Sequence, residues 1–578
     1  MAQLGAQPLC NLGYGDDGSP NGGVFADLDV WLDDELIPIM KNRFAYNGDL
    51  LSQTGKLSES PYTVLVQHEK TLAEKDLRIP EWHDRLFNYS RSAAHACPQG
   101  AYQYNSKLLR IPSIEGSSNL PLLGAVTVNE RITAEGWMQN TRHIKINVVA
   151  NDAQSQALPS PEDANGHHLP YQAGDVAAVM PSNSTCEVDR FLAVLPTSIR
   201  SMADCTLDIQ VKPSSKANSP WPEKCTLRGL LSHCADLQGL PEREDLFALA
   251  QFCHPEHREG TAHKSKLLSL SETSGAALYG DYIIREKRNW ADVFYDFDSL
   301  RWEGPGGGKA LLTIEHLLAI LPSIAPRYFS IASSPSHLAL RTQKDSRSFE
   351  IELCVAVVEG KTPRGRKYSG LCSTYLSKMA PSSRSDTSNL IRMWIRPGSF
   401  SNLPMQPATN LTRSRFFETP VLCIGAGTGI APLRALIMER EANWKDIAGP
   451  GNREGQDVDN ILVYGNRKKT KDYYYDVEWD KLVLSNRLRT ILAFSRDQPN
   501  KFYVQRALRE ADGGEFIVQH LIHRKGAVYI AGGSKMARAV KDEILESLSS
   551  AFSGGERDAK KFMNKLKRRG LLSIEAWS

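Results

Sequence analysis

The chain has 578 residues, of which 41% are hydrophobic and 23% charged, and 69 Lys and Arg face 66 Asp and Glu for a net charge of +3. This length is enough for roughly four domains. The composition excludes disordered, collagen-like and membrane-embedded proteins, and the near balance of charge gives no reason to expect a nucleic-acid or membrane partner.

The 10 cysteines are scattered along the chain without any C-x-x-C spacing. Their pattern therefore predicts no zinc or iron–sulfur site, and we expect them to be reduced thiols of a cytoplasmic protein. The first residues lack the basic and then apolar regions of a signal peptide. No run of 18 apolar residues suggests a membrane span.

Short β-rich runs separated by Gly, Pro and Ser predict an antiparallel barrel in two parts, at about 120–190 and 323–415. The expected strands are 123–129, 141–149, 327–330, 349–358 and 391–395. Between the two parts, about 191–322, helical patterns occur at 225–234, 241–253, 264–279, 290–297 and 313–321. We expect a helical insertion that splits the barrel. Residues 46–119 lack a clear pattern and are expected to form a linker.

The C-terminal region, about 416–578, is typical of a nucleotide-binding α/β domain. An apolar run at 421–424 leads into Gly425-Ala-Gly-Thr-Gly-Ile-Ala-Pro432 and then an amphipathic stretch, which predicts a strand, a glycine turn and a helix. Further strands are expected at 460–464, 489–494 and 527–530, and a helix at 535–552. This alternation predicts a parallel sheet. Exposed loops are expected at 152–170, 304–308 and 448–459.

Two groups in this region suit a dinucleotide. The glycine turn around Thr428 lets a phosphate approach backbone amides at a helix N-terminus, although the same turn can serve as a tight connection without a ligand. Ser495, Arg496 and Lys501 suit an additional phosphate, and Tyr503 suits stacking on adenine, which favours NADPH over NADH. A solvated basic patch is the alternative.

Three other motifs carry possible chemistry. In the barrel, Arg327, Phe329 and Ser330 lie close enough in sequence to serve a flavin, although a half-buried strand would look the same. Gly370 to Ser373 opens a helical stretch and forms a second candidate anion-binding turn. At the C-terminus, Trp577 suggests a functional ring or a docked tail. The basic run 560–569 is expected to be a solvated helix face.

These motifs, in this order, resemble the diflavin reductase family, which includes NADPH–cytochrome reductases, the sulfite reductase flavoprotein, the nitric oxide synthase reductase half and NADPH-dependent diflavin oxidoreductases. The matching strings are RYFSIASS, GLCS, GAGTGIAP, YGNRKKTKDYYYDVEW, AFSRDQ, KFYVQ and the C-terminal AWS. The resemblance covers about 120–578. It implies a ferredoxin–NADP reductase type barrel that binds FAD, split by a helical insertion and followed by an NADPH-binding α/β domain.

The resemblance also implies roles for individual residues. Ser330 would hydrogen-bond near the hydride-accepting atom of the flavin, Trp577 would cover the flavin and swing aside for nicotinamide, and Glu575 would be a carboxylate near the flavin. The implied FAD contacts are Arg288, Arg327, Tyr328, Phe329, Ser330, Gly370, Leu371, Cys372, Ser373 and Trp577. The implied NADPH contacts are Thr428, Ser495, Arg496, Lys501, Phe502, Tyr503, Val504 and Gln505.

The chain departs from the family pattern in three places. Ala531 stands where many relatives have a cysteine near the nicotinamide, and Ala539 stands where many have an aspartate that contacts NADP. We expect differently tuned hydride transfer rather than its loss, because the cofactors carry the chemistry. Residues 1–45 resemble only the last part of a flavodoxin-like FMN domain, which needs about 100–150 residues. The full-length family uses FMN, but we expect this chain alone not to hold it.

The first functional hypothesis is an NADPH-dependent flavoprotein oxidoreductase in which hydride passes from NADPH to FAD and electrons then leave singly. The closest subgroup by resemblance is NADPH-dependent diflavin oxidoreductase, which implies an anamorsin-type iron–sulfur protein as partner in cytosolic iron–sulfur cluster assembly. The alternatives are a sulfite-reductase-type or cytochrome-reductase-type flavoprotein, or a truncated, non-catalytic binding module.

Overall fold

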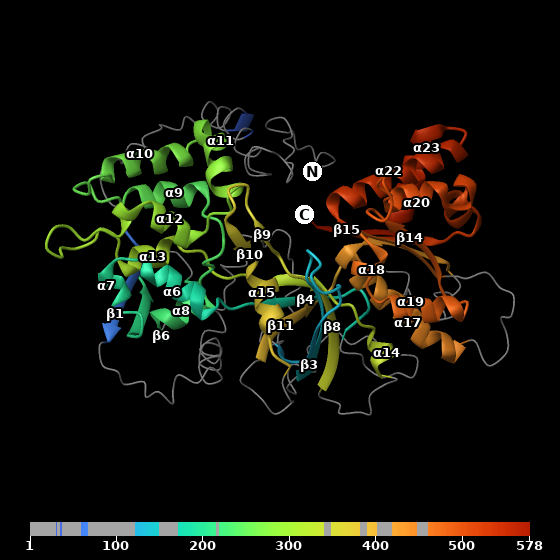
Figure 1. Ribbon diagram of the computed structural model, residues 1–578, viewed down its shortest axis with the longest axis horizontal. Helices are drawn as coiled ribbons and strands as arrows, with labels where there is room; N and C mark the ends of the chain where they lie inside the picture. Colours follow the sequence, from blue (N-terminus) through green and yellow to red (C-terminus); the bar gives the residue numbers. More distant parts are fainter. Residues whose placement is uncertain are drawn as a thin grey trace. The chain divides into compact units, whose positions relative to one another are not determined.

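The computed structural model describes residues 59–67, 122–149, 171–215, 219–222, 224–339, 348–381, 390–400, 419–447 and 460–577, with the single positions 31, 35 and 36. The chain divides into two compact units (Figure 1). The helical unit comprises the described residues of Met1–Pro112, Ser182–Ala325 and Glu359–Leu371. The barrel–sheet unit comprises those of Ser113–Pro181, Pro326–Val358 and Cys372–Ser578.

Six antiparallel strands in the barrel–sheet unit pair in the order β7-β4-β11-β2-β3-β8. Their bounds are β2 Leu122–Arg131, β3 Thr141–Val149, β4 Val176–Met180, β7 Arg327–Ser330, β8 Ser348–Ala356 and β11 Leu390–Arg396. A bridge between Ile331 and Leu353 joins the two edges, so the sheet closes on itself. This confirms the predicted antiparallel architecture, including the strands at 141–149 and 327–330.

Alternation along the strands explains how the barrel forms. In β3 the apolar residues Ile144, Ile146 and Val148 are fully buried in the barrel core, while the residues between them are polar. Because successive side chains of a strand point to opposite faces, this period of two places one face inward. Burial of that apolar face drives closure, at roughly 25 cal/mol per Å² removed from water.

A buried carboxyl group near the barrel core makes stability depend on pH. Asp175, only 3% exposed, accepts a hydrogen bond from the backbone N–H of Gln172 at 2.8 Å, and burial raises its pKa to about 6. The folded state therefore holds a proton that the unfolded chain releases near its ordinary pKa of 3.8. Stability should fall as the pH rises from about 4 to 6 and stay lower above that range.

The variant Asp175→Asn should therefore gain stability relative to the parent protein as the pH rises, by up to about 3 kcal/mol between pH 4 and pH 8. The check is the unfolding midpoint of both proteins at the two pH values. Glu130→Gln changes an exposed carboxylate on β2 and is the control. An Asp175→Asn effect of equal size at both pH values would contradict the assignment.

The C-terminal half of the barrel–sheet unit is a parallel sheet, as predicted. Its five strands pair in the order β14-β13-β12-β15-β16. Their bounds are β12 Val421–Ala426, β13 Asn460–Asn466, β14 Arg489–Phe494, β15 Ala527–Gly533 and β16 Leu572–Trp577. Every adjacent pair is parallel. The last strand, β16, was not predicted; the C-terminal motif continues the sheet rather than forming a separate tail.

Helices cover both faces of this sheet (Figure 1). Val421 and Cys423 of β12 face one core, with helices α17 (Ile430–Ile447) and α19 (Asp476–Leu484). Leu422 and Ile424 face the other core, with α20 (Val504–Glu510), α22 (Ser534–Ala551) and α23 (Gly555–Arg568). A parallel sheet covered by helices on both faces requires strands with apolar residues on both faces, because both are buried. Smaller helical segments are α18 (Lys469–Asp472), α21 (Phe516–Val518), η8 (Gly427–Gly429), η9 (Ala511–Gly514) and η10 (Gln519–His523).

The helical unit contains the predicted helices of 191–322, with shifted ends. They are α6 Thr185–Ala193, α7 Thr197–Arg200, α8 Leu227–His233, α9 Arg243–Ala250, α10 Gly260–Ser271, α11 Ala276–Tyr279, α12 Trp290–Asp296 and α13 Ile314–Ile320, with η5 Thr273–Gly275, η6 Gly280–Ile284 and η7 Asp298–Leu300. In sequence they lie between β4 and β7. The hairpin β9 (Glu359–Lys361) and β10 (Lys367–Ser369) also belongs to this unit.

One strand of the helical unit differs from the predictions. Residues 62–67, expected in a linker, form β1 (Tyr62–Gln67), which pairs with β5 (Thr206–Val211) and, through it, β6 (Lys224–Thr226). Tyr62 and Val64 join the core of this unit, so tertiary burial makes this segment a strand. Residues 1–30 and the loops 152–170 and 448–459 lie outside the described residues. Among described helices, none is long and apolar enough to cross a membrane.

Candidate cofactor sites

The glycine turn after β12 is built as the sequence predicts. Gly427 has φ of 56°, a left-handed conformation that favours glycine, and η8 leads directly into α17. A Cβ at Gly429 would lie 2.1 Å from the carbonyl oxygen of Ala531 on β15. The turn is therefore packed against the neighbouring strand, and the amides of a helix N-terminus stay open to an anion.

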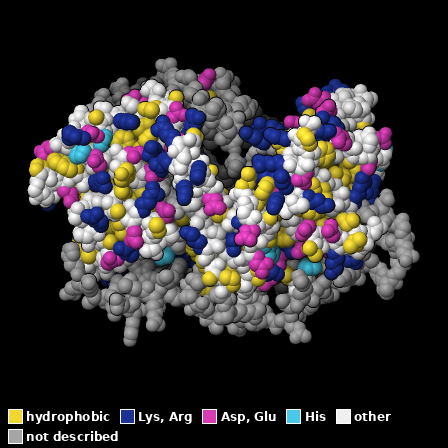
Figure 2. Space-filling model, viewed as in Figure 1, with side chains coloured by type: hydrophobic (Ala, Val, Ile, Leu, Met, Phe, Trp, Pro, Cys, Tyr) yellow, Lys and Arg dark blue, Asp and Glu magenta, His cyan; other side chains and the backbone are white. Residues whose placement is uncertain are grey.

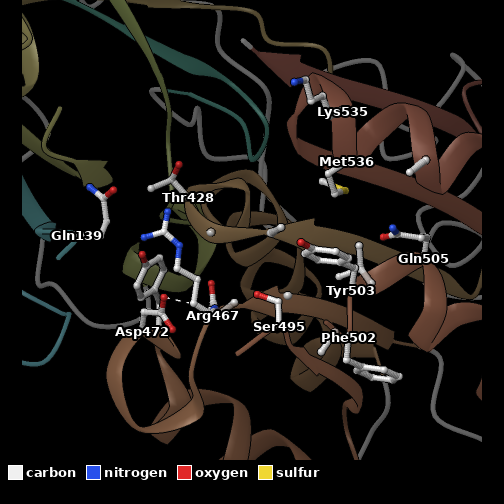
Figure 3. A pocket seen from close by; sticks show the side chains of 18 of the residues that line it. Gln139, Thr428, Arg467, Asp472, Ser495, Phe502, Tyr503, Gln505, Lys535 and Met536 are labelled. Carbon is white, nitrogen blue, oxygen red and sulfur yellow. Dashed lines mark hydrogen bonds between the residues drawn. The ribbon is translucent and has the colours of Figure 1, made fainter. Parts of the chain in front are cut away.

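A cavity of about 600 Å³ opens beside this turn, in the barrel–sheet unit (Figure 3). It is lined by Gln139, Ala356, Ala426, Gly427, Thr428, Gly465, Asn466, Arg467, Asp472, Tyr474, Ala493, Ser495, Phe502, Tyr503, Val504, Gln505, Lys535, Met536 and Ala539. Eight of these residues, at 426–428, 465–467, 493 and 495, stand at the carboxyl ends of β12, β13 and β14 or just beyond them. This is the edge at which open parallel sheets bind ligands.

The structure brings most of the predicted NADPH residues together around the cavity. Thr428 and Ser495 line it, together with the four consecutive residues Phe502, Tyr503, Val504 and Gln505. Tyr503 is 44% exposed, as suits a residue that stacks on a ligand. Arg496 and Lys501 are exposed and do not belong to the lining. They flank Ser495 and Phe502 in the chain, so both stand next to lining residues.

Sequence reasoning missed several lining residues. Arg467 and Lys535 bring positive charge to the cavity, and Gln139 reaches it from the barrel. In Figure 3 the Arg467 side chain extends toward Gln139 and Thr428. Asp472 accepts hydrogen bonds from the backbone N–H of Arg467 at 3.3 Å and of Lys468 at 2.7 Å, which fixes this turn. The string GNRKK contains Arg467 and could have drawn attention to it, but the direction in which its side chain points depends on the fold.

The predicted catalytic residues Ser330 and Glu575 meet in the structure. The hydroxyl of Ser330, on β7, donates a hydrogen bond to Oε1 of Glu575, on β16. Oε2 of Glu575 is buried without a partner among the described residues. Burial raises the pKa of Glu575, although the bond from Ser330 lowers it. The carboxyl group is therefore disposed to hold a proton at this position. Trp577 ends the same strand and is 38% exposed.

The aromatic residues of β7 point in opposite directions. Tyr328 is 50% exposed, whereas Phe329 is partly buried and packs against the barrel core. Arg327 begins the strand and is partly exposed. The exposed ring of Tyr328 and the side chain of Arg327 therefore lie at the edge of the barrel, and both suit the binding of a flavin. The assignment of Phe329 to the flavin ring stays a prediction.

The second predicted anion-binding turn lies at the start of α15 (Leu371–Lys378). The thiol of Cys372 is buried and faces the carbonyl of Val179, so only its backbone can reach a ligand. The hydroxyl of Ser373 accepts a hydrogen bond from the N–H of Val358 at 3.0 Å and keeps its own proton to donate. Oγ1 of Thr374 is buried without a partner among described residues. This donor fits a pyrophosphate at a helix N-terminus.

Arg288 belongs to the helical unit, where its guanidinium pairs with Asp296 and lies 4.5 Å from the ring centre of Tyr282. Its predicted contact with FAD stays a prediction.

A buried ion-pair network joins the barrel to the parallel sheet within the barrel–sheet unit. Arg434 of α17 binds Glu352 of β8 at 2.5 Å and Glu478 of α19 at 2.6 Å, and donates to the carbonyl of Ala332 at 2.7 Å. Burial alone would raise the pKa of Glu352, but the positive charges of Arg434, His143 and Lys145 outweigh it and lower the pKa to about 2. The network fixes how the two halves of this unit meet.

The departures from the family pattern have clear positions. Ala531 is fully buried on β15, opposite Gly425 of β12 and Glu575 of β16. Ala539 lines the cavity on α22, beside Lys535 and Met536. Ala539 therefore lies against the cavity, whereas the side chain of Ala531 is buried within the sheet.

Comparison with known proteins agrees with this geometry. A model of the FAD binding domain matches residues 160–375, and a model of the oxidoreductase NAD-binding domain matches residues 423–542. NADPH-dependent diflavin oxidoreductase 1 of Xenopus laevis is 30% identical over 100% of this chain and 81% of its own length. The protein of the same name from Danio rerio is 28% identical over 79% of this chain. NADPH–cytochrome P450 reductase of Drosophila melanogaster is 26% identical over 100% of this chain and 71% of its own length.

The chain belongs to the diflavin reductase family. Members of this family are oxidoreductases that use FAD and NADPH, and the two matched domains supply both binding modules in this chain. The chain spans 66% of the length of the Danio rerio relative. The family thus accounts for the FAD-type barrel, the NADP-type sheet and the cavity at its carboxyl edge.

Proposed function

We propose that this chain takes electrons from NADPH and delivers them, through bound FAD, to a one-electron protein acceptor. The observation that carries the proposal is a continuous edge of the parallel sheet. Thr428 and the cavity follow β12, Ala531 lies two residues before the end of β15, and Glu575 lies opposite Ala531 on β16. Neighbouring strands are about 4.8 Å apart. A nucleotide in the cavity would therefore end close to the Ser330–Glu575 pair.

Residues of the barrel and of the parallel sheet fit FAD at this edge. Within the described part of the chain, Oε2 of Glu575 and the hydroxyl of Thr374 have no partner, and these groups and the exposed Tyr328 are what a bound flavin would satisfy or cover. Arg327 and the amides of 370–373 suit its pyrophosphate. The chemistry that bound FAD supplies is the acceptance of hydride and the return of electrons one at a time.

The protein's own contribution is positioning and proton handling. Ser330 orients Glu575, whose raised pKa lets it hold a proton at Oε1 or Oε2. Trp577 offers a ring face at the end of the same strand, where it would exclude water from the reacting edge and move aside for nicotinamide. Gly427 and Thr428 present amides to the phosphates.

Selection of NADPH over NADH requires positive charge near the adenosine 2′-phosphate. We propose that Arg496 and Lys501 supply it, together with Ser495, on the loop after β14. Arg467, which reaches the cavity itself, is better placed for the pyrophosphate. Each charge-assisted hydrogen bond contributes about 1.5–3 kcal/mol.

The acceptor is proposed from the resemblance. We propose that the family's FMN centre and then an anamorsin-type iron–sulfur protein receive the electrons, in cytoplasmic iron–sulfur cluster assembly. We also propose that the helices between β4 and β7 are the family's connecting insertion. The alternative is a cytochrome-reductase-type role, because some relatives are named NADPH–cytochrome P450 reductase.

The purified chain should carry one FAD, no FMN, and bleach at 450 nm when NADPH is added. NADPH should support reduction of an artificial acceptor at least tenfold better than NADH, and Arg496→Ala should reduce this preference by about 10- to 100-fold. The measurements are flavin extraction and kcat/KM for both nucleotides. Lys560→Ala removes an exposed lysine of α23 paired with Glu556 and is the control.

A colourless protein would favour the non-catalytic binding module. Equal use of NADH and NADPH would contradict the role of Arg496 and Lys501, and FMN in equal amount to FAD would contradict the expectation from residues 1–45.

A further inference from the structure

We propose that the helical unit contains a binding site for a divalent transition metal of the Zn²⁺ class, formed by His257, His263 and Asp298. None of the three residues belongs to the strings that carry the family resemblance, and cysteine spacing could not reveal the site. One donor atom from each of the three residues lies within 4.8 Å of the others. Figure 2 shows histidine and acidic side chains together on the surface near the start of α10.

Two of the three separations between donor atoms are closer to those of a coordination shell than to hydrogen bonds. Nε2 of His257 lies 3.5 Å from Oδ1 of Asp298, and Nδ1 of His263 lies 3.8 Å from the same oxygen. Zinc bonds to nitrogen and oxygen are about 2.0–2.1 Å, which separates tetrahedral donors by about 3.3–3.4 Å. Hydrogen bonds between such atoms are usually 2.7–3.2 Å. A small closing movement of the three side chains would complete the shell.

Backbone hydrogen bonds hold the ligands in place before any metal binds. His257 N–H donates to the carbonyl of His254 at 3.1 Å, and His263 N–H donates to the carbonyl of Glu259 at 2.8 Å. The N–H of His254 donates to the carbonyl of Ser299, beside Asp298, at 3.1 Å. The turn before α10 is thus tied to η7. A Cβ at Gly260 would lie 1.9 Å from the carbonyl oxygen of His254, so this turn is closely packed.

The surroundings of His263 suit a metal ligand. Its Nε2 lies 3.3 Å from Oε2 of Glu259, and its ring packs edge-on against Phe297. A proton on Nε2 shared with a carboxylate leaves the Nδ1 lone pair for the metal, which is the usual arrangement behind a ligating histidine. The hydroxyl of Ser299, 3.0 Å from Nδ1, would have to turn away or join the shell.

The hydrogen bonding of His257 is expected to limit the affinity of the site for a metal ion. The N–H of Glu259 donates to its Nδ1 at 3.2 Å, which places the proton of the neutral ring on Nε2. Ligation through Nε2 requires this proton to move to Nδ1, and the bond from Glu259 is then lost. We therefore expect a dissociation constant on the order of micromolar, weaker than that of cysteine-rich structural zinc sites.

The donor set selects the class of metal. Two imidazoles and one carboxylate suit Zn²⁺ and Co²⁺, whereas Mg²⁺ and Ca²⁺ prefer oxygen ligands alone. The Asp298 side chain is 45% exposed, so solvent can reach a fourth position. A bound ion would clamp the start of α10 to the segment that follows α12, and would stabilise the folded helical unit because only the folded chain assembles the ligands.

The test is titration of the full, flavin-loaded chain with Co²⁺ after treatment with a chelator. We expect one Co²⁺ per chain, with d–d absorption between 550 and 650 nm, outside the main bands of oxidised flavin, and displacement by Zn²⁺. His257→Asn and Asp298→Asn should weaken binding at least tenfold. His254→Asn is the matched control, because His254 is in the same turn but packs against Trp302 rather than joining the site.

Zn²⁺ should also raise the thermal unfolding midpoint of the parent protein and of His254→Asn, but not that of Asp298→Asn. This readout does not depend on NADPH oxidation. Co²⁺ binding that is absent, or equal in all four proteins, would overturn the proposal.

Discussion

Replacing Arg434 by methionine is expected to lower the free energy of unfolding of the barrel–sheet unit by about 3–5 kcal/mol. Arg434 is 5% exposed and Glu352 is 2% exposed. Removal of the arginine leaves the Glu352 carboxylate buried with only Lys145, at 2.8 Å, and the more distant His143. The flat guanidinium also lies 4.6 Å from the ring centre of Tyr475, and this contact is lost as well.

The measurement is urea denaturation, followed by the fluorescence of FAD released from the barrel. The double variant Arg434→Met/Glu352→Leu should recover part of the loss, because it removes the stranded charge together with its partner. Arg506→Met is the matched control: its pair with Glu510 is about half exposed on both sides, and such pairs contribute at most about 1 kcal/mol. A loss for Arg434→Met no larger than that of Arg506→Met would refute the role of the network.

Gly429→Ala should weaken binding of NADP⁺ by about 5- to 100-fold while the FAD content stays unchanged. The new methyl group would lie 2.1 Å from the carbonyl oxygen of Ala531 and 2.6 Å from its carbonyl carbon. Both are backbone atoms of a central strand, so the glycine turn itself must shift. Overpacking of this kind costs about 1–3 kcal/mol, and each 1.4 kcal/mol corresponds to a factor of ten in affinity. Calorimetric titration with NADP⁺ checks this result.

Gly427→Ala provides the contrast within the same turn. Its φ of 56° makes alanine unfavourable by about 1–2 kcal/mol, but the added Cβ meets nothing within 4 Å. We expect a small loss of stability and an NADP⁺ affinity within about threefold of the parent protein. Equal weakening by both substitutions would show that backbone conformation, rather than packing against β15, controls the site.

The local pattern of residues predicted much of the cofactor machinery. The alternating apolar residues of β3, the doubly apolar β12 and the glycine turn each depend on interactions within a few residues, so their structure follows from periodicity. Thr428, Ser495 and Tyr503 could be found because parallel strands bring their carboxyl ends to one edge. The segment at 62–67 could not, because it becomes β1 only through pairing with β5.

By itself, the sequence determined the family, the two cofactor domains and six of the residues that line the cavity, because these reside in contiguous motifs. The tertiary structure alone decided which charges reach the cavity, since Arg467 enters the lining whereas Arg496 and Lys501 remain outside it. It also decided that Glu575 meets Ser330 across 245 positions and that His257, His263 and Asp298 converge. Contacts between residues so far apart in the chain depend on tertiary packing, which produces no periodic pattern in the sequence.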